Sequence, residues 1–250
     1  MAAERVIPQL ARYGFGSAMA LFVLSIAWIG SLALAPVAGA DASASERISF
    51  LADNQGWHIV NFAIVAPMGF VHVPLWLGLA GIVWLKRPAC AALVASFGLI
   101  YAPFTVIGYW TQLTTVRGIV ELHETSPEAA ISVFEIMEFS SNFWSWSYGI
   151  VVLGYGTWGL AAFAVFAGTV DIPYRLARVT GILFGLAGLL SVVGAIGFIA
   201  RNQLAELGVV FSGIVFMPAL IGAAALLYQV SQGLDLHGDP ASLRDHSSES

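Results

Sequence analysis

The chain has 250 residues, of which 58% are hydrophobic and only 10% are charged, and its formal net charge is −5. Ordinary soluble domains carry about a quarter charged residues, so this sequence has too few polar side chains to cover a water-facing globule, and we expect the lipid bilayer to be its main partner. The sequence contains no basic stretch, which argues against a nucleic-acid partner, and its single cysteine, Cys90, excludes a disulfide framework.

Six apolar stretches are long enough to cross a hydrocarbon core of about 30 Å, which takes roughly 20 helical residues. They are residues 14–38, 57–85, 89–113, 143–168, 178–200 and 207–230. Helices satisfy their own backbone hydrogen bonds, which lipid cannot do for them, and the alternating pattern of a membrane barrel is absent. The predicted fold class is therefore all-α, with a bundle of six transmembrane helices in residues 1–232. The polar tail, 233–250, is expected to be disordered.

The basic residues are divided unevenly between the two predicted sides of the membrane. The side that holds both termini carries Arg5, Arg12, Lys86, Arg87, Arg175, Arg178 and Arg244. The opposite side carries only Arg47, Arg117 and Arg201. Because loops rich in Lys and Arg stay inside, both termini are predicted to be cytoplasmic, in the cytoplasmic membrane of a bacterial cell.

The first span has some features of a secretory signal peptide. Ala38-Gly39-Ala40 resembles a cleavage site, and Arg5 and Arg12 could form the basic region before it. The apolar core of a signal peptide is about 7–15 residues long, however, and this apolar run is longer than that. We expect the span to be retained as an anchor. Cleavage, which would leave five spans, is the alternative.

Three pieces of the first half carry a resemblance to known families. A loop of small residues with Arg47 (ASASERISF) precedes a long second span (NFAIVAPMGFVHVPLWLGLA), and a short basic turn with proline (LKRPACAAL) leads into the third. This layout resembles families of small bacterial six-helix membrane proteins that are known only as domains of unknown function. The resemblance implies the membrane topology and assigns no functional residue.

Four prolines lie near the middle of three spans, namely Pro67, Pro74, Pro103 and Pro218. Each lacks an N–H and so frees the carbonyl four residues earlier. In a membrane, such a carbonyl needs another partner or lines a cavity. Kinked helices are the simplest interpretation, and the similar depth of the breaks also favours a central pocket.

His72 lies close to the centre of the second span. A charged side chain at that depth costs about 2.5–3.5 kcal/mol on insertion scales, so we expect His72 to be neutral and turned into the bundle. One interpretation is a ligand contact or a proton relay; the other is a hydrogen bond between helices, to a freed carbonyl or a tyrosine hydroxyl. Tyr101, in the third span, belongs with His72 to the deeper part of the predicted site.

The segment 114–142 is the longest predicted loop on the outer side. A helix is expected to begin there at Pro127, with Ser126 as its cap. Polar residues at helical spacing then continue into the fourth span as one stripe, formed by Glu135, Glu138, Asn142, Ser145 and Gly149. If the tryptophans at 144 and 146 mark the headgroup level, both glutamates lie in water and the stripe is a polar entrance. An exposed face that binds nothing is the alternative.

Cofactor sites have little support in the sequence. His58 and His72 are 14 residues apart, which places them within roughly 40° of one helical face and about 21 Å apart. Haem b would also need ligands from a neighbouring helix, and only a methionine, for example Met217, could supply one there. The ELHE piece at 121–124 lacks the spacing that puts two histidines on one face. We therefore expect no cofactor and no metal site.

The sequence favours an integral membrane protein that binds or passes a small, largely apolar molecule through an aromatic-lined cavity. The predicted ligand-binding residues are His72, Tyr101, Glu138, Asn142 and Ser145. One alternative is an intramembrane enzyme for a lipid or isoprenoid substrate, in which Glu135 or Glu138 exchanges protons with the substrate. The sequence leaves enzymatic activity open and assigns no catalytic residue.

A second alternative is an accessory or assembly subunit of a membrane complex. Gly181, Gly185 and Gly188 line one side of the fifth span, and small residues at this spacing let helices approach closely. Packing within the bundle is the simpler interpretation. A partner subunit, or a second copy of the chain, is the other.

Overall fold

A computed structural model describes residues 2–39, 41–84, 86–139 and 144–234, with side chains from Val6 onward, and within these ranges the chain forms helices and no strand. The helices are α1 (Ala2–Leu34), α2 (Ala44–Asp53), α3 (Gln55–Val65), α4 (Met68–Trp84), α5 (Pro88–Thr125), α6 (Pro127–Met137), α7 (Trp146–Thr169), α8 (Arg175–Ile199), α9 (Gln203–Glu206) and α10 (Gly208–Ser231). The predicted all-α class is confirmed.

Six of the helical stretches are long and apolar enough to cross a membrane. They are Val6–Leu34, Gln55–Trp84, Pro88–Thr125, Trp146–Thr169, Arg175–Ile199 and Gln203–Ser231. These stretches confirm the prediction of six helices that could span a membrane, and two of them differ most from the predicted bounds. The first extends from Val6 to Leu34, where 14–38 was predicted, and the third continues to Thr125, twelve residues beyond the predicted 113.

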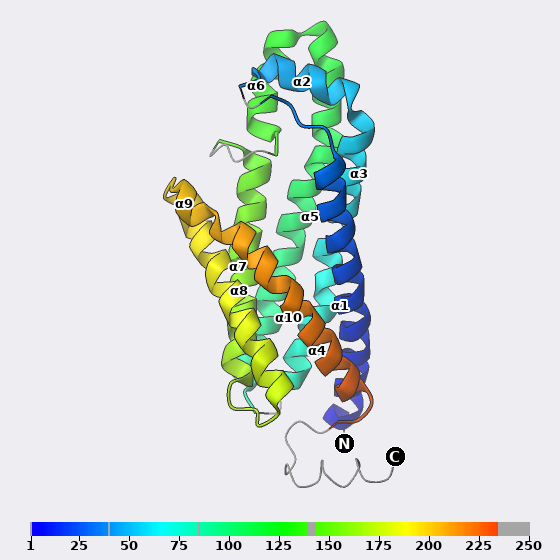
Figure 1. Ribbon diagram of the computed structural model, residues 1–250, viewed down its shortest axis with the longest axis vertical. Coiled ribbons are helices and arrows are strands. Elements are labelled where there is room, and N and C mark those ends of the chain that lie inside the picture. The colour runs from blue at the N-terminus through cyan, green and yellow to red at the C-terminus, as the bar shows by residue number, and fades with distance from the viewer. Residues whose placement is uncertain (1, 40, 85, 140–143, 235–250) are drawn as a thin grey trace.

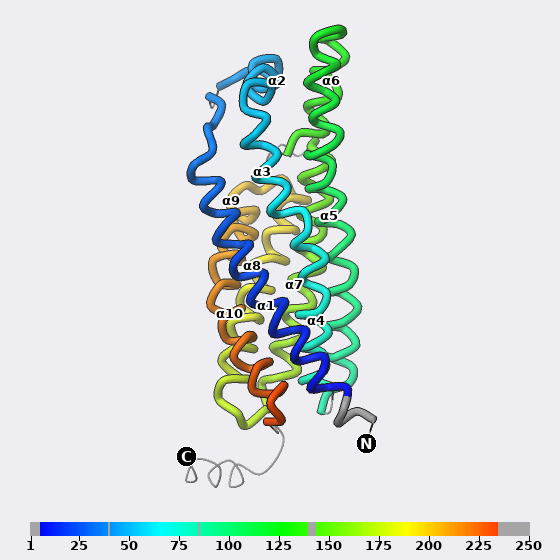
Figure 2. Tube along the Cα trace, turned by 90° about the vertical axis from the view of Figure 1, so that its right-hand side faces the viewer, coloured from blue at the N-terminus to red at the C-terminus, as the bar shows by residue number. Residues whose placement is uncertain are grey.

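The spans form a closed ring in chain order. α1 packs against α4, α4 against α5, α5 against α7, α7 against α8, α8 against α10, and α10 returns to α1 (Figure 1). The start of α1 and the end of α10 lie at one end of the bundle, which we call the terminal end. α2 and α6 lie at the opposite end, the cap end (Figure 2).

One proline interrupts the second span, and three others are accommodated inside helices. Pro67 separates α3 from α4, whereas Pro74, Pro103 and Pro218 lie within α4, α5 and α10. A proline removes a backbone donor and crowds the preceding turn. Near Pro74, the Ser17 hydroxyl of α1 donates a hydrogen bond to the Val71 carbonyl, one residue after Phe70, whose carbonyl the proline leaves without its helical donor.

Glycines allow α7 and α8 to approach closely. A Cβ atom added to Gly188 would lie 2.5 Å from the Gly159 carbonyl oxygen, and one added to Gly159 would lie 2.7 Å from the Gly188 oxygen. Gly181 and Gly185 face Thr169 and Phe166 of α7 in the same way. The glycine side of the fifth span is therefore used inside the bundle.

The cap end carries a small apolar core of its own, where α2 and α6 pack against the distal half of α5. Its buried residues are Ile48, Val116, Ile119, Val120, Ala130 and Phe134. This packing explains why α5 continues beyond the predicted membrane boundary. The helix predicted at Pro127 is confirmed, with Ser126 at its N-cap position, but the Ser126 side chain makes no hydrogen bond to the first turn.

Candidate functional site

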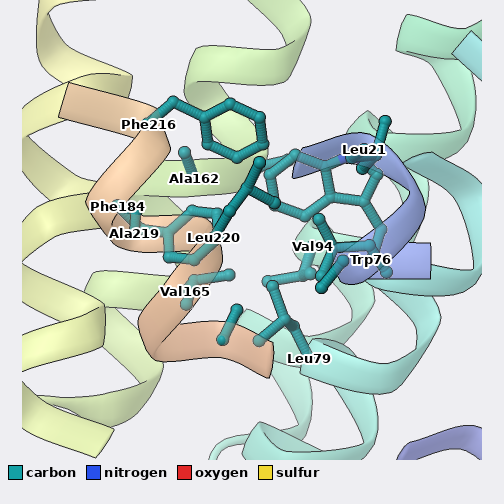
Figure 3. Packing of buried hydrophobic residues seen from close by; sticks show 14 of the residues in the cluster. Leu21, Trp76, Leu79, Val94, Ala162, Val165, Phe184, Phe216, Ala219 and Leu220 are labelled. Atoms are coloured by element: carbon teal, nitrogen blue, oxygen red, sulfur yellow. The ribbon is translucent and has the colours of Figure 1, made fainter. Parts of the chain in front are cut away.

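The middle of the ring is filled by a group of aromatic side chains that we call the aromatic centre. Its members are His72, Trp76, Tyr101, Trp158, Phe184 and Phe216. All six are buried. They come from α4, α5, α7, α8 and α10, so five of the six spans meet there. Figure 3 shows three of them, Trp76, Phe184 and Phe216.

His72 faces the bundle interior, as predicted, and lies beside Tyr101. The two ring centroids are 4.9 Å apart in an edge-on arrangement, and the imidazole is stacked 5.6 Å from the Phe216 ring. Its Nδ1–H donates a 2.7 Å hydrogen bond to the Met68 carbonyl, one turn earlier in α4. Met68 belongs to the same helix as His72. The His72 Nδ1–H therefore does not make the hydrogen bond between helices that was one of the two interpretations.

Trp76 is one of four residues of the aromatic centre that sequence reasoning missed; the others are Trp158, Phe184 and Phe216. The Trp76 side chain is 0% exposed, and its indole Nε1–H has no hydrogen-bond partner in the described part of the chain. Gly98 of α5 makes room for the ring, since a Cβ there would lie 2.5 Å from Trp76 Cδ1. Buried polar groups are almost always hydrogen-bonded, so this donor marks a place for an acceptor. Tryptophans are buried in many proteins, so the sequence alone does not indicate that the indole of Trp76 is a buried donor without an acceptor.

Three tyrosines form a row between the aromatic centre and the cap end, and we call this row the tyrosine file; it consists of Tyr101, Tyr155 and Tyr109. The hydroxyl oxygens of Tyr109 in α5 and Tyr155 in α7 are 3.1 Å apart and share a hydrogen bond. The Tyr155 ring is 6.1 Å from that of Tyr101, which contacts His72. Beyond Tyr109, the Phe139 ring lies 5.3 Å away. No spacing rule joins residues on different helices in this way, so the tyrosines could not be connected from the sequence.

Gln112 holds the chain where α6 ends. Its buried side chain donates to the Met137 carbonyl (2.7 Å) and accepts from the Phe139 N–H (3.2 Å). The His58 Nε2–H donates to the backbone carbonyl of Gln112 (3.0 Å). A hollow of about 10 Å³, room for about one water, lies beside these groups and is lined in part by His58 and Gln112.

The predicted helical stripe is wrong because the chain is not helical through it. α6 ends at Met137, Glu138 is extended (φ −60°, ψ 138°), and α7 begins only at Trp146. Ser145 caps α7, accepting from the Tyr148 N–H and donating to the Glu138 backbone carbonyl at 2.5 Å. Ser145 and Glu138 are thus joined by a hydrogen bond. Asn142 lies outside the described residues.

Glu138 is not free in water, which corrects the expectation for both glutamates. Its Oε2 lies 3.1 Å from Arg47 of the α2 helix, and its side chain is only 18% exposed. Burial raises the pKa of Glu138, and the positive charge of Arg47 only partly offsets that rise. Glu135 is exposed, as predicted. The two carboxylates therefore have different surroundings.

The fold separates the histidines that were considered as ligands of a haem or a metal. His58 belongs to α3 and His72 to α4, on either side of the Pro67 break. His123 Nε2 is 3.1 Å from the Ser45 hydroxyl and joins α5 to α2, while Glu121 and Glu124 beside it are exposed.

Glu206 is a second feature that sequence reasoning missed. It lies in the short helix α9 and is only 7% exposed, and its Oε1 accepts a 2.6 Å hydrogen bond from the Tyr148 hydroxyl. The hydropathy pattern places Glu206 at the edge of the sixth span. A four-residue helix that turns this carboxylate inward has no clear signature in the sequence.

No protein-family model, curated protein or solved structure matches the chain. The class of the protein rests on the fold: six long apolar helices, closed into a ring around an aromatic centre, define a multi-pass α-helical membrane protein.

Proposed function

We propose that this membrane protein binds a small, largely apolar molecule that carries a hydrogen-bond acceptor such as a carbonyl group, and that the molecule contacts Trp76 in the aromatic centre. The observation that carries the proposal is the fully buried Trp76 indole, whose N–H lacks an acceptor among the described residues. Leaving such a donor unpaired costs about 1–3 kcal/mol. A ligand carbonyl would recover that cost.

The surroundings of Trp76 fit the same class of ligand. Small-molecule sites are mostly apolar and aromatic, with a few polar groups that fix the orientation. Here the aromatic walls are supplied by Trp158, Phe184 and Phe216, and the polar groups by His72 and Tyr101. Polar side chains within a membrane bundle are costly and mark functional positions. Because the rings are in contact, a ligand enters by moving side chains apart.

The geometry supports binding more than passage. Towards the terminal end from Trp76, the core is apolar and tightly packed: Leu79 and Val83 of α4 are each 1% exposed. A Cβ atom added to Gly168 of α7 would lie only 2.3 Å from Val83. The hydroxyl groups of the tyrosine file lie between the aromatic centre and the cap end. We therefore propose that the ligand reaches the centre from the cap end.

The side of the membrane that the cap end faces follows from the positive charges. Six crossings leave both ends of the described helices on one side, and the bases favour that side as cytoplasmic. We therefore place the cap outside, in a bacterial cytoplasmic membrane. Ligand entry from the outer leaflet or from the external medium is part of this proposal.

A matched pair of compounds tests the proposal. Thermal-shift measurements on the purified protein compare 2-acetylnaphthalene with 2-ethylnaphthalene, which has similar size and apolarity but no acceptor. We expect the ketone to raise the Tm more than the hydrocarbon, and Trp76→Phe to remove the difference. Trp84→Phe, on the same helix but 53% exposed, is the control. Equal shifts in the unaltered protein, or an unchanged difference in Trp76→Phe, would contradict the proposal.

The two alternatives have less support in the geometry. For an intramembrane enzyme, Glu135 is exposed and Glu138 is paired with Arg47 at the cap end, away from the aromatic centre. For an assembly subunit, the glycine faces suggested for partner contacts pack against α7. Neither arrangement offers a specific observation in favour of that role.

A further inference from the structure

The carboxylate of Glu206 is held in place at the cap end by the packing of α9 on α8. The side chain of Asn202 accepts a hydrogen bond from the Ala205 N–H (3.1 Å) and fixes the first turn of α9. Gly197 of α8 lets this turn approach, because a Cβ there would lie 2.5 Å from the Glu206 nitrogen. The buried position of Glu206 is therefore set by close backbone packing.

The carboxylate has no positive partner in the described part of the chain. Its one hydrogen bond there comes from the Tyr148 hydroxyl, a neutral donor, which uses one of about four acceptor positions. Two bases of the cap end are engaged elsewhere: Arg47 pairs with Glu138, and the Arg201 guanidinium lies 5.1 Å from the Trp144 ring. Buried carboxylates are rarely left without a counter-ion.

The aromatic neighbours of Tyr148, the hydrogen-bond partner of this carboxylate, indicate what kind of cation would pair with it. The Tyr148 ring is 5.2 Å from the Phe139 ring and 5.6 Å from the Phe198 ring, both edge-on. Aromatic faces attract organic cations. A calcium ion would need six to eight oxygen ligands, and the described contacts of Glu206 supply its own carboxylate and one phenol.

We propose that Glu206, together with the rings of Tyr148, Phe139 and Phe198, binds an alkylammonium group. The exposed indoles of Trp144 and Trp146 lie just before Tyr148 in the chain and mark the headgroup level at this end. An ammonium there could belong to a choline or ethanolamine lipid headgroup, or to a free amine. This site is separate from the aromatic centre and does not depend on a ligand binding at Trp76.

Calorimetric titration with tetramethylammonium chloride tests the proposal, in nanodiscs of phosphatidylglycerol, which lack a competing ammonium. We expect saturable binding that Glu206→Gln weakens at least tenfold. Glu121→Gln, at an exposed position in α5, should leave it unchanged. Tyr148→Phe keeps the ring and should retain binding, whereas Tyr148→Leu should weaken it. Absent saturable binding, or equal binding by Glu206→Gln, overturns the proposal.

A labelling experiment on the unaltered protein covers the case in which Glu206→Gln does not fold. Dicyclohexylcarbodiimide modifies membrane-embedded carboxyl groups, and mass spectrometry measures its addition at Glu206. Tetramethylammonium should protect Glu206 against the reagent; undiminished labelling at saturating salt overturns the proposal. Repeating the titration in phosphatidylcholine nanodiscs shows whether the ammonium belongs to a lipid headgroup or to a free amine. Weaker apparent binding there assigns the site to a lipid headgroup, and equal binding assigns it to a free amine.

Discussion

Tyr109 and Tyr155 share a hydrogen bond across two helices, with their hydroxyl oxygens 3.1 Å apart. This bond links the two halves of the site that the sequence predicted separately. His72 and Tyr101 lie on one side of it, at the aromatic centre, and Glu138 and Ser145 lie on the other, at the base of the cap.

Removing either hydroxyl of this pair tests whether the bond stabilises the fold. Tyr109→Phe and Tyr155→Phe should each lower the free energy of unfolding by about 1 kcal/mol, the usual net value of such a bond. Because both changes remove the same interaction, the double variant should lose little more than either single one. Equilibrium unfolding in mixed micelles measures this, with Tyr13→Phe, 69% exposed, as the control. Fully additive losses would contradict a shared bond.

The two side-chain hydrogen bonds of Gln112, which we call the Gln112 clamp, should be needed to hold Met137 and Phe139 in place at the end of α6. Gln112→Leu removes a donor to the Met137 carbonyl and an acceptor for the Phe139 N–H. The Met137 carbonyl keeps its 2.9 Å hydrogen bond from the Ser147 hydroxyl. The main loss therefore falls on the Phe139 N–H, at about 1–3 kcal/mol for a buried group left without a partner. We expect a lower Tm and faster hydrogen exchange at Phe139. Thr114→Ala, an exposed site half a turn further along α5, should behave like the parent protein. Unchanged exchange at Phe139 in Gln112→Leu would show that the clamp is dispensable.

The close approach of α7 and α8 should not tolerate a side chain. Gly188→Ala would place Cβ 2.5 Å from the Gly159 carbonyl oxygen, and backbone cannot move aside cheaply. Overpacking of this kind costs about 1–3 kcal/mol. Gly213→Ala has no atom within 4 Å of its new Cβ and is the matched control. A Gly188→Ala variant as stable as Gly213→Ala in unfolding experiments would show that the helices can separate without cost.

Much of the architecture was predictable because lipid imposes simple rules. Length and hydropathy gave all six spans, and the Pro127 start of α6 followed from local helix chemistry. His72 was correctly placed inside because a polar group at that depth avoids lipid.

The features that sequence reasoning missed depend on contacts between distant residues. The chain leaves helical geometry at Glu138 in a segment held by Gln112, which lies 25 residues before Met137, and no local pattern encodes that contact. The extension of α5 depends on α2 and α6 packing against it. The unpaired Trp76 indole and the buried Glu206 likewise become visible only when neighbouring helices are in place.

The pH dependence of stability should report on Glu138. Its pKa is raised above the usual 4.5 by burial. An acid with a raised pKa in the folded state contributes stability that is complete below its unfolded pKa and is lost as the pH rises through the folded pKa. The Tm should therefore fall as the pH rises above 4.5, and Glu138→Gln should reduce that fall.

Glu128→Gln is the control for this experiment, since Glu128 is in α6 on the same cap but exposed. Arg47→Gln should raise the pKa of Glu138 further, because it removes the charge that partly offsets burial. The fall in Tm would then extend to higher pH. An equal effect of Glu128→Gln and Glu138→Gln on the profile would contradict this account.

The proposed ligand contact at Trp76 can be observed directly by NMR. The chain contains eight tryptophans, so indole-labelled protein gives eight N–H signals, and Trp76→Phe identifies the one from Trp76. On titration with 2-acetylnaphthalene, the Trp76 indole proton should move downfield as its N–H gains an acceptor, and 2-ethylnaphthalene should not produce this shift. If the ketone binds at saturation while the Trp76 indole signal stays in place, the aromatic centre is not the site where its carbonyl is recognised.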